Sequence, residues 1–408
     1  MDRDRARRRL LAARHRPARV RRLVLDRSRG LPRPAPRRRR RPLRARDPGL
    51  HPRPRRRVSG QNPARGRGAA SVFDRGGALS KRVLVTGGAG FISSNFIRHL
   101  LANTAYEVVS LDALTYAGNL ENLADVMGHE RLSFVHGDIR DAELVAKVVA
   151  EVDVIVNAAA ESHVEKSIEE GASEFVTTNV EGTQILLDAI RRAPVERFIL
   201  ISSSEVYGTA ECAPMDEEHP LNPRSPYAAT KAGGDRLAYS YFVTYGLPIV
   251  IVRPFNNYGP RQHPEKVIPR FITQALAGSP LTIHGDGHAS RDWLYVDDDA
   301  EAIEAIIASD IDSLAGEVVN VATGIDISVA DVADAVLAVT DSSSARVHVA
   351  ERLGQVDRHI GSTGKLERLT GFRARTSFEQ GLERTVAWYR ENETWWKTVL
   401  ERDRVSSF

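Results

Sequence analysis

The sequence predicts an α/β fold that is built on a doubly wound parallel sheet and followed by a smaller C-terminal α/β domain. Three observations support this prediction. Short apolar runs alternate with helical patterns from residue 81 onward, an order that is typical of βαβ units. A glycine-rich turn joins the first apolar run to the first helical pattern, and an acidic residue ends the second run. The 328 residues after the first eighty are also enough for one large domain or two modest ones.

Two regions of opposite charge meet near residue 80. Residues 1–80 contain 27 Arg, no Lys and 5 Asp, whereas residues 81–408 carry 30 Lys and Arg against 48 Asp and Glu. The first region also holds 9 of the 20 prolines and a single aromatic residue, Phe73. Because so few bulky apolar groups cannot offset the entropy lost on ordering, we expect residues 1–78 to be a disordered Arg-rich extension.

Three origins would account for this extension. A basic arm that binds nucleic acid or a membrane surface would be Arg-rich, and so would an organelle transit peptide. The absence of Lys argues against both, because selection for positive charge seldom excludes Lys, and no interleaved aromatic residues are present to stack on bases. We favour a start codon assigned upstream of the true one, between Val72 and Leu79, and we expect no nucleic acid and no membrane as partners.

Cysteine usage and hydropathy exclude other classes of protein. The only cysteine, Cys212, rules out a disulfide scaffold, and no spacing of His, Cys and carboxylates resembles a metal site. No apolar run approaches the roughly 18 residues that span a bilayer. We therefore expect a cytoplasmic protein without a structural metal.

The first strand and helix enclose a glycine-rich turn. Lys81–Thr86 predicts a buried strand and Ser94–Leu101 predicts an amphipathic helix. Between them, the spacing Gly87-x-x-Gly90 lets the backbone turn tightly and approach a pyrophosphate at the helix N-terminus. Strand, turn and helix in this order predict a dinucleotide site on a Rossmann sheet. The residues expected at the cofactor here are Gly87, Gly90, Phe91 and Ile92.

Asp112 ends the second apolar run, Glu107–Asp112, 22 residues after Gly90. A carboxylate at this place accepts hydrogen bonds from the adenosine ribose and repels a 2′-phosphate, so we predict NAD rather than NADP as the cofactor.

Two further apolar runs, Leu132–His136 and Val152–Asn157, predict the next strands. We expect the residues after the first of them to flank the adenine, and the small residues after the second to let the nicotinamide half pass close to the backbone. These residues are Asp138, Ile139, Ala158 and Ala160.

A Tyr and a Lys are predicted four residues apart on one helix. Ser225 and Pro226 are a suitable N-cap and first helical residue, which places Tyr227 and Lys231 on the same face. A free Tyr is a poor base because its pKa is near 10. A nearby ammonium and a positive nicotinamide ring stabilise the phenolate, and lowering its pKa by about 3 units requires roughly 4 kcal/mol. We therefore predict Tyr227 as the base and Lys231 as its partner.

With these residues in place, the chain resembles the extended short-chain dehydrogenases/reductases that act on nucleotide sugars, over essentially all of residues 81–400. Several segments resemble the dTDP-glucose 4,6-dehydratases in particular. They are Leu111–Glu121, Ala159–Ser167, Asn256–Pro260, Pro264–Pro269 and Arg291–Asp297. The resemblance implies an NAD-binding Rossmann domain at 79–253, an interleaved nucleotide-sugar-binding domain at 254–408, and a homodimer. Since these enzymes return the hydride, it also implies NAD as a bound prosthetic group.

The resemblance further implies a 4,6-dehydration. Tyr227 takes the proton of the 4-hydroxyl while hydride passes from carbon 4 to NAD, and Glu205 then removes the carbon 5 proton. The 6-hydroxyl leaves as water, and hydride returns to carbon 6. The family places an Asp–Glu pair after a Ser or Thr at this strand end. Ser203 and Glu205 match that pattern, whereas Ser204 stands in place of the Asp.

Ser204 keeps alternatives open, because a serine does not efficiently supply the leaving-group proton. Either Glu205 acts as both base and acid, or the enzyme diverts from the 4-keto intermediate, as an NDP-sugar 4-epimerase or a UDP-glucuronate decarboxylase would on the same scaffold. A non-catalytic NAD-sensing or RNA-binding Rossmann protein is a more remote alternative, since Tyr227 and Lys231 are both present.

Substrate residues are also implied by the resemblance, which adds Asn257 at the nicotinamide side of the cofactor site. The arginines among them provide forked, charge-assisted contacts to a pyrophosphate. The expected substrate residues are Ser204, Glu205, Asn256, Lys266, Val267, Thr282, His284, Arg291, Asn320 and Arg352.

Overall fold

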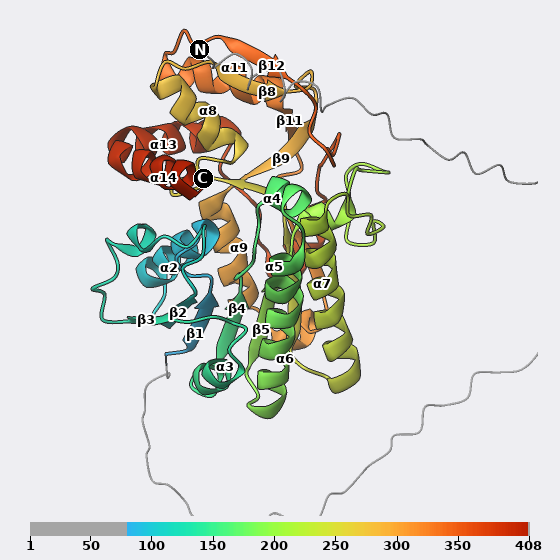
Figure 1. Cartoon of the computed structure of the whole chain (residues 1–408). Helices are drawn as coiled ribbons and strands as arrows, with labels where there is room; N and C mark the ends of the chain where they lie inside the picture. The colour runs from blue at the N-terminus through green and yellow to red at the C-terminus, as the bar shows by residue number, and fades with distance from the viewer. Residues whose placement is uncertain (1–79, 407–408) are drawn as a thin grey trace, which may run out of the picture. The chain divides into compact units, whose positions relative to one another are not determined.

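The computed structural model describes residues 80–406 (Figure 1). The expected extension at residues 1–78 and the expected start between Val72 and Leu79 both lie outside the described residues.

A seven-stranded parallel sheet forms the larger part of the described fold. Its strands β1 to β5 are labelled in the lower half of Figure 1. The order is β10-β6-β5-β4-β1-β2-β3, and all of its strand pairs are parallel. Strands β2 and β3 are added on one side of β1, and β4, β5 and β6 on the other, so the boundary between β1 and β4 is the switch point of a doubly wound sheet. The predicted fold class is thus confirmed. The strands are β1 (Arg82–Thr86), β2 (Glu107–Asp112), β3 (Leu132–His136), β4 (Val154–Asn157), β5 (Arg197–Ile201), β6 (Ile249–Pro254) and β10 (Val318–Val321).

Helices cover both faces of this sheet, so its central strands are apolar on both sides. In β1, Val83 and Val85 face one core, and Leu84 between them faces the other. The first core is shared with α2 and α9, and the second with α3, α6 and α7. These helices are α2 (Phe91–Asn103), α9 (Val296–Ala308), α3 (Ala142–Val149), α6 (Thr183–Arg192) and α7 (Pro226–Tyr245).

Helix α2 begins at Phe91, three residues before the expected start at Ser94. The reason is the extended backbone of Gly90, which serves as the N-cap without a side chain. The first turn of the helix therefore follows the glycine turn directly, and its free N–H groups lie at that turn.

A smaller group of elements packs around a separate core (Figure 1). It contains a three-stranded sheet, β11-β9-β7, and a parallel pair, β12-β8. Its elements are β7 (Asn256–Tyr258), α8 (Val267–Leu276), β8 (Leu281–His284), β9 (Ser290–Tyr295), β11 (Asp326–Ser328), α11 (Val329–Thr340), β12 (Arg346–Val349), α13 (Phe378–Glu391) and α14 (Glu393–Ser406).

The chain crosses between these two groups more than once. Helix α9 packs on α2, and β10 pairs with β6 in the large sheet, although both follow residue 254 in the sequence. The boundary that we expect at residue 253 stays a prediction, and the elements on either side of it interleave.

The remaining short elements connect the layers. They are η1 (Leu120–Leu123), α4 (Val164–Glu169), α5 (Ser173–Val176), η2 (Thr177–Gly182), η3 (Ser204–Tyr207), α10 (Ile311–Leu314) and α12 (Gly364–Thr370). Within residues 80–406, no helix is both long and apolar enough to cross a lipid bilayer.

Candidate active site

A cavity of about 1160 Å³ lies at the carboxyl ends of the parallel strands. Five consecutive strands of the large sheet each contribute a residue from their carboxyl end, namely Gly87, Asp112, Gly137, Ala158 and Ser203. Doubly wound sheets bind their ligands in a crevice at this edge.

Most of the predicted site residues line this one cavity, although they come from segments far apart in the sequence. They are Gly87, Gly90, Phe91, Ile92, Asp112, Asp138, Ile139, Ala158, Ala160, Ser203, Ser204, Glu205, Tyr227, Lys231, Asn256, Asn257, Lys266, Val267, His284, Arg291 and Arg352.

The structure does not bring two predicted substrate residues, Asn320 and Thr282, to the cavity, and this corrects the expectation for both. Asn320 is fully buried in β10. Its Oδ1 accepts a hydrogen bond from Tyr207 (2.8 Å) and its Nδ2 donates to the Met215 carbonyl (3.1 Å). Thr282 in β8 pairs with Val347, and its hydroxyl accepts from the Gln274 side chain (3.3 Å). These hydrogen bonds hold the side chain of Asn320 inside the protein, and Thr282, in the β8–β12 pair, is not among the residues that line the cavity.

The glycine turn approaches the next strand closely. Gly87 has φ +66°, and a Cβ at this position would lie 2.8 Å from the Cα of Ala159. Only glycine fits both the backbone conformation and the contact. The turn thus forms a cradle between β1 and β4 that any side chain would fill.

Asp112 is fixed beside this turn by backbone groups. Its Oδ2 accepts from the N–H of Ala89 (2.9 Å) and its Oδ1 from the N–H of Leu114 (2.7 Å). Burial raises the pKa of Asp112, and these two hydrogen bonds oppose the rise. The carboxylate therefore has a fixed place at the end of β2, where its remaining lone pairs are free to accept from a ribose.

Helix α7 begins as predicted, with Pro226 in its first turn and with the Ser225 hydroxyl accepting from the N–H of Ala228. Tyr227 is hydrogen-bonded to Ser203 at the end of β5. Lys231 donates from Nζ to the Ile201 carbonyl at 2.7 Å. Helix α7 is thus tied to the carboxyl end of β5 by two of its side chains.

Within the chain alone, the pKa of Tyr227 lies above that of a free Tyr. Burial raises it to about 12, while Ser203 and Lys266 oppose that rise. Burial also lowers the pKa of Lys231 to about 8. The ammonium of Lys231 is directed to a backbone carbonyl. The positive charge of Lys266 lowers the pKa of the phenol, whereas the charge of Glu205 raises it.

Glu205 has a partner that sequence reasoning missed. Its Oε1 lies 3.9 Å from Nδ1 of His359, and Nε2 of that ring lies 2.6 Å from the Gly208 carbonyl oxygen. His359 is fully buried, whereas Ser204 lines the cavity beside Glu205. A single histidine 154 residues after Glu205 gives no spacing signal in the sequence.

A second group that sequence reasoning missed surrounds Glu265. The Glu265 carboxylate lies 2.8 Å from Nε2 of His163 and 2.9 Å from Nζ of Lys266. Burial alone would raise the pKa of Glu265, but Lys266, His163 and His263 hold it well below its usual range. Lys266 was a predicted substrate residue. Three of the four residues, His163, Glu265 and Lys266, lie in segments that carry the family resemblance, so a signal for this group was present.

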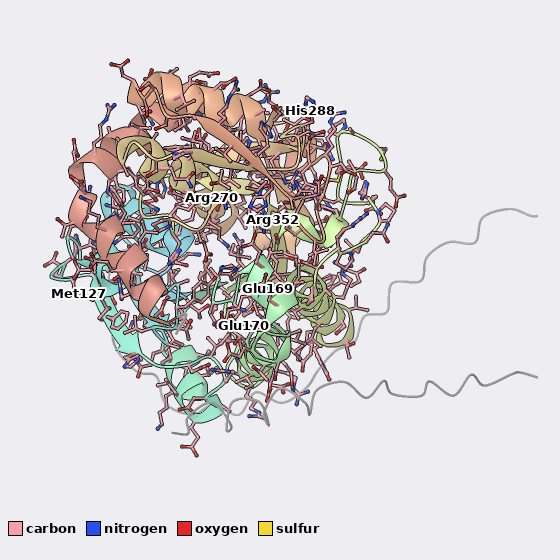
Figure 2. The ribbon with its side chains drawn as sticks, turned by 45° about the horizontal axis from the view of Figure 1, so that its top comes forward. Met127, Glu169, Glu170, Arg270, His288 and Arg352 are labelled. Atoms are coloured by element: carbon pink, nitrogen blue, oxygen red, sulfur yellow. The ribbon has the colours of Figure 1, made fainter. Side chains whose placement is uncertain are left out.

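Arg270, Arg291 and Arg352 are three of the six arginines that line the same cavity. Figure 2 shows Arg270 and Arg352 close together, and the charge of Arg352 lowers the pKa of Arg270. The Arg352 side chain forms an ion pair with Glu165 (3.0 Å), whereas Nε of Arg270 is buried and has no hydrogen-bond partner. Sequence reasoning missed Arg270. The cluster is suited to a dianion, because guanidinium groups bind phosphate oxygens in a forked geometry.

Comparisons with known proteins agree with this site. The model of the GDP-mannose 4,6 dehydratase family matches residues 84–385. A low-salt glycan biosynthesis protein of Haloferax volcanii is 49% identical over 309 residues, which cover 75% of this chain and 98% of that protein. A dTDP-glucose 4,6-dehydratase of Streptomyces niveus is 43% identical over 331 residues, which cover 80% and 97%.

Solved structures give the same result. A dTDP-glucose 4,6-dehydratase from Streptomyces venezuelae, solved with NAD bound, has 48% identity and a TM-score of 0.75 and covers 78% of this chain and 99% of its own. A UDP-glucuronic acid 4-epimerase from Bacillus cereus, solved with UDP-glucuronic acid and NAD, has 31% identity and a TM-score of 0.72 over 76% and 99%. The family match, the parallel sheet and the residues of the cavity together show that this chain belongs to the GDP-mannose 4,6-dehydratase family, among the short-chain dehydrogenases/reductases of nucleotide sugars.

Proposed function

We propose that this chain is an NAD-dependent nucleotide-sugar 4,6-dehydratase that converts dTDP-glucose, or a related NDP-hexose, to the 4-keto-6-deoxy sugar. The observation that carries this proposal is the convergence of Tyr227, Lys231, Ser203 and Glu205 on one cavity beside the glycine turn. The names of the relatives support it, since most of those compared are dTDP-glucose 4,6-dehydratases.

The residues of the glycine turn fit NAD. The cradle at Gly87 would hold a pyrophosphate against the backbone, and the N-terminus of the helix that follows Gly90 would offer it free N–H groups. Asp112 is placed to accept from the ribose hydroxyls. When bound, NAD accepts and returns the hydride, and its positive nicotinamide ring favours the phenolate of Tyr227.

The side chains of the cavity move the protons of the proposed reaction. Tyr227, hydrogen-bonded to Ser203, takes the proton of the 4-hydroxyl. Glu205 takes the proton of carbon 5 once the neighbouring 4-ketone has made it acidic. The hydroxyl of Ser204 is too weak an acid to protonate the departing 6-hydroxyl.

The opposite side of the cavity is suited to the nucleotide. Arg270, Arg291 and Arg352 supply the positive charge that a pyrophosphate needs.

An NDP-sugar 4-epimerase or a UDP-glucuronate decarboxylase is the second candidate. Ser204 favours it, because an enzyme that does not expel the 6-hydroxyl needs no acid at this position. The 31% identity to a UDP-glucuronic acid 4-epimerase supports it as well.

A panel of nucleotide sugars separates these candidates. The protein is incubated with dTDP-glucose, UDP-glucose, GDP-mannose and UDP-glucuronate in deuterated water, and the products are analysed by mass. A 4,6-dehydratase loses water and gains one deuterium at carbon 5, a decarboxylase loses carbon dioxide, and a 4-epimerase changes neither mass nor isotope. Loss of carbon dioxide, or an epimer without deuterium, would replace the proposed function with the second candidate.

We also propose a homodimer and a cytoplasmic location. Helix α7 exposes Tyr239, Val243 and Tyr245, and the adjacent α5 exposes Val176, so an apolar face is available to a second copy. The exposed free thiol of Cys212 is compatible with a reducing compartment. Sedimentation of the unmutated protein and of Val243→Glu tests the dimer, because a charge in a self-complementary interface should give a monomer.

A further inference from the structure

His359 contacts the site from behind Glu205. Its ring does not line the cavity, but Nδ1 lies 3.9 Å from Oε1 of Glu205, and that residue does line it. The two residues are 154 positions apart in the sequence, so only the folded chain brings them together.

The ring of His359 has a fixed orientation. Nε2 lies 2.6 Å from the carbonyl oxygen of Gly208, and because a carbonyl only accepts, Nε2 carries the hydrogen. The Phe255 ring packs edge-on against the imidazole, with 6.0 Å between the ring centroids. Nδ1 is buried and has no hydrogen-bond partner. The lone pair of Nδ1 is therefore the group presented to the Glu205 carboxylate.

Two acceptors that face each other in a buried site are stabilised by one shared proton, which rests on either of them. The charged groups around the ring are Glu205 from η3, Arg291 from β9 and His219 from the loop that follows η3. Burial lowers the pKa of His359, Glu205 opposes that effect, and Arg291 and His219 add to it. Because the pKa of His359 is lowered overall, the ring gives up a proton to the carboxylate more readily than a free imidazole would.

We propose that His359 is a positioning residue that shares one proton with Glu205, so that Glu205 acts first as the base at carbon 5 and then as the acid toward the oxygen on carbon 6. This inference rests on the proposed 4,6-dehydratase function. The pair supplies the proton that Ser204 does not, and a spacing of 3.9 Å is short enough for a ring and a carboxylate to close when the substrate binds.

The protons of the reaction balance with such a pair. Two leave the sugar, one from the 4-hydroxyl to Tyr227 and one from carbon 5 to Glu205. Two are taken up: one by the oxygen on carbon 6, which departs as water with the electron pair of the broken C–O bond, and one by carbon 5 when hydride returns to carbon 6. Glu205 takes part in three of these transfers. Between these transfers, Nδ1 of His359 holds the proton of the pair. After the last transfer, the proton that Tyr227 took passes through the solvent of the cavity and returns the pair to its starting state.

His359→Gln tests this proposal, because the amide nitrogen still donates to Gly208 while no ring nitrogen titrates beside Glu205. The NAD-loaded protein is mixed rapidly with dTDP-glucose, bound NADH reports the oxidation, and water loss and deuterium at carbon 5 report the elimination. We expect NADH to form at an unchanged rate and the elimination to slow about 100-fold, the lower end for general acid–base catalysis. NADH should therefore accumulate, and the pH profile of the elimination should lose one limb.

His348→Gln is the matched control, since Nδ1 of His348 also lies 2.8 Å from a glycine carbonyl oxygen, that of Gly285, but at an exposed position outside the cavity. It should leave both steps unchanged. Equal slowing of oxidation and elimination in His359→Gln would show a merely structural role and overturn the proposal, as would an unchanged elimination.

A second measurement does not depend on turnover. In protein with ¹⁵N-labelled histidine, the signals of His359 are assigned by their loss in His359→Gln. The pKa of His359 should fall in Glu205→Gln, because the carboxylate stabilises the protonated ring. An unchanged pKa would contradict the shared proton even if the sugar is turned over. If no nucleotide sugar gives NADH with the unmutated protein, the proposed function fails, and this titration still decides whether the pair exists.

Discussion

The ammonium of Lys231 donates a 2.7 Å hydrogen bond to the backbone carbonyl of Ile201, at the carboxyl end of β5. This bond fixes the first turns of α7 against the sheet and thereby places Tyr227 at the cavity. With burial raising the pKa of Tyr227 to about 12, the chain holds this phenol protonated at neutral pH. A base at this position therefore needs further positive charge, which the oxidised nicotinamide provides when it is bound.

Tyr227→Phe should abolish hydride transfer and leave NAD bound. The loss of a base that acts in the transition state lowers the rate of the step by a factor of about 100 to 10,000. Formation of bound NADH on mixing with dTDP-glucose measures the step. Tyr106→Phe, at a position outside the cavity, should behave as the unmutated protein. Oxidation at a normal rate in Tyr227→Phe would mean that another residue deprotonates the sugar.

The unmutated protein should bind NAD more tightly than NADP, and Asp112→Ala should narrow the difference, because it removes the carboxylate that repels a 2′-phosphate. Titration calorimetry with both cofactors gives the ratio. The substitution also breaks the hydrogen bonds to Ala89 and Leu114, so thermal unfolding is followed in parallel. Equal affinity of the unmutated protein for the two cofactors would refute the assignment to NAD.

Ser204→Asp should speed the elimination without a large change in affinity for the sugar. An aspartic acid in water has a pKa near 3.9, and burial and the adjacent Glu205 raise the pKa of the new carboxyl group toward neutral pH, so that it can protonate the departing hydroxyl. The rate of 4-keto-6-deoxy product formation measures the effect. In the Ser204→Asp protein, His359→Gln should slow the elimination less than it does in the unmutated protein, because a second acid is present. A slower reaction in Ser204→Asp would favour the decarboxylase or epimerase.

Arg291→Gln should weaken nucleotide-sugar binding. Burial lowers the pKa of this guanidinium, as expected for a cation that is held out of water at a site for an anion. A charge-assisted hydrogen bond contributes about 1.5–3 kcal/mol, so KM should rise about 10- to 100-fold while kcat changes less. Arg358→Gln is the control, since Arg358 is exposed and paired with Asp326. A KM equal to that of the control would place the pyrophosphate elsewhere.

Asp299→Asn should stabilise the protein above neutral pH. Burial raises the pKa of Asp299 to about 7, and its Oδ2 accepts from Nδ2 of Asn257, whereas its Oδ1 has no partner. Between about pH 4 and pH 7 the folded chain binds a proton that the unfolded chain does not, so the contribution of Asp299 to stability falls as pH rises through this window. A rise of about 3 in the pKa corresponds to at most about 4 kcal/mol at pH values above 7.

Thermal unfolding of Asp299→Asn across this pH range is the measurement, with Glu301→Gln at an exposed position of α9 as the control. The gain in Tm over the unmutated protein should be large near pH 8 and small near pH 4. A gain that does not depend on pH would show that Asp299 does not titrate in this window.

The sequence by itself determined the features that depend on a few neighbouring residues. Gly87 was predictable because a positive φ and a close backbone approach both require glycine. The start of α7 was predictable because the Ser225 cap and Pro226 act within one turn, and this start places Tyr227 and Lys231 on one face. The alternation of short apolar runs with helical patterns also indicated the parallel sheet, since each run can be recognised from its own few residues.

Only the tertiary structure decided which distant residues meet. It placed His359 against Glu205 and Arg270 beside Arg352, and it buried Asn320 in the large sheet. It also packed α9 against α2, on one face of the large sheet. The physical reason is that such contacts depend on strand order and register, which follow from burying all the apolar faces together. No segment of the sequence carries that information alone.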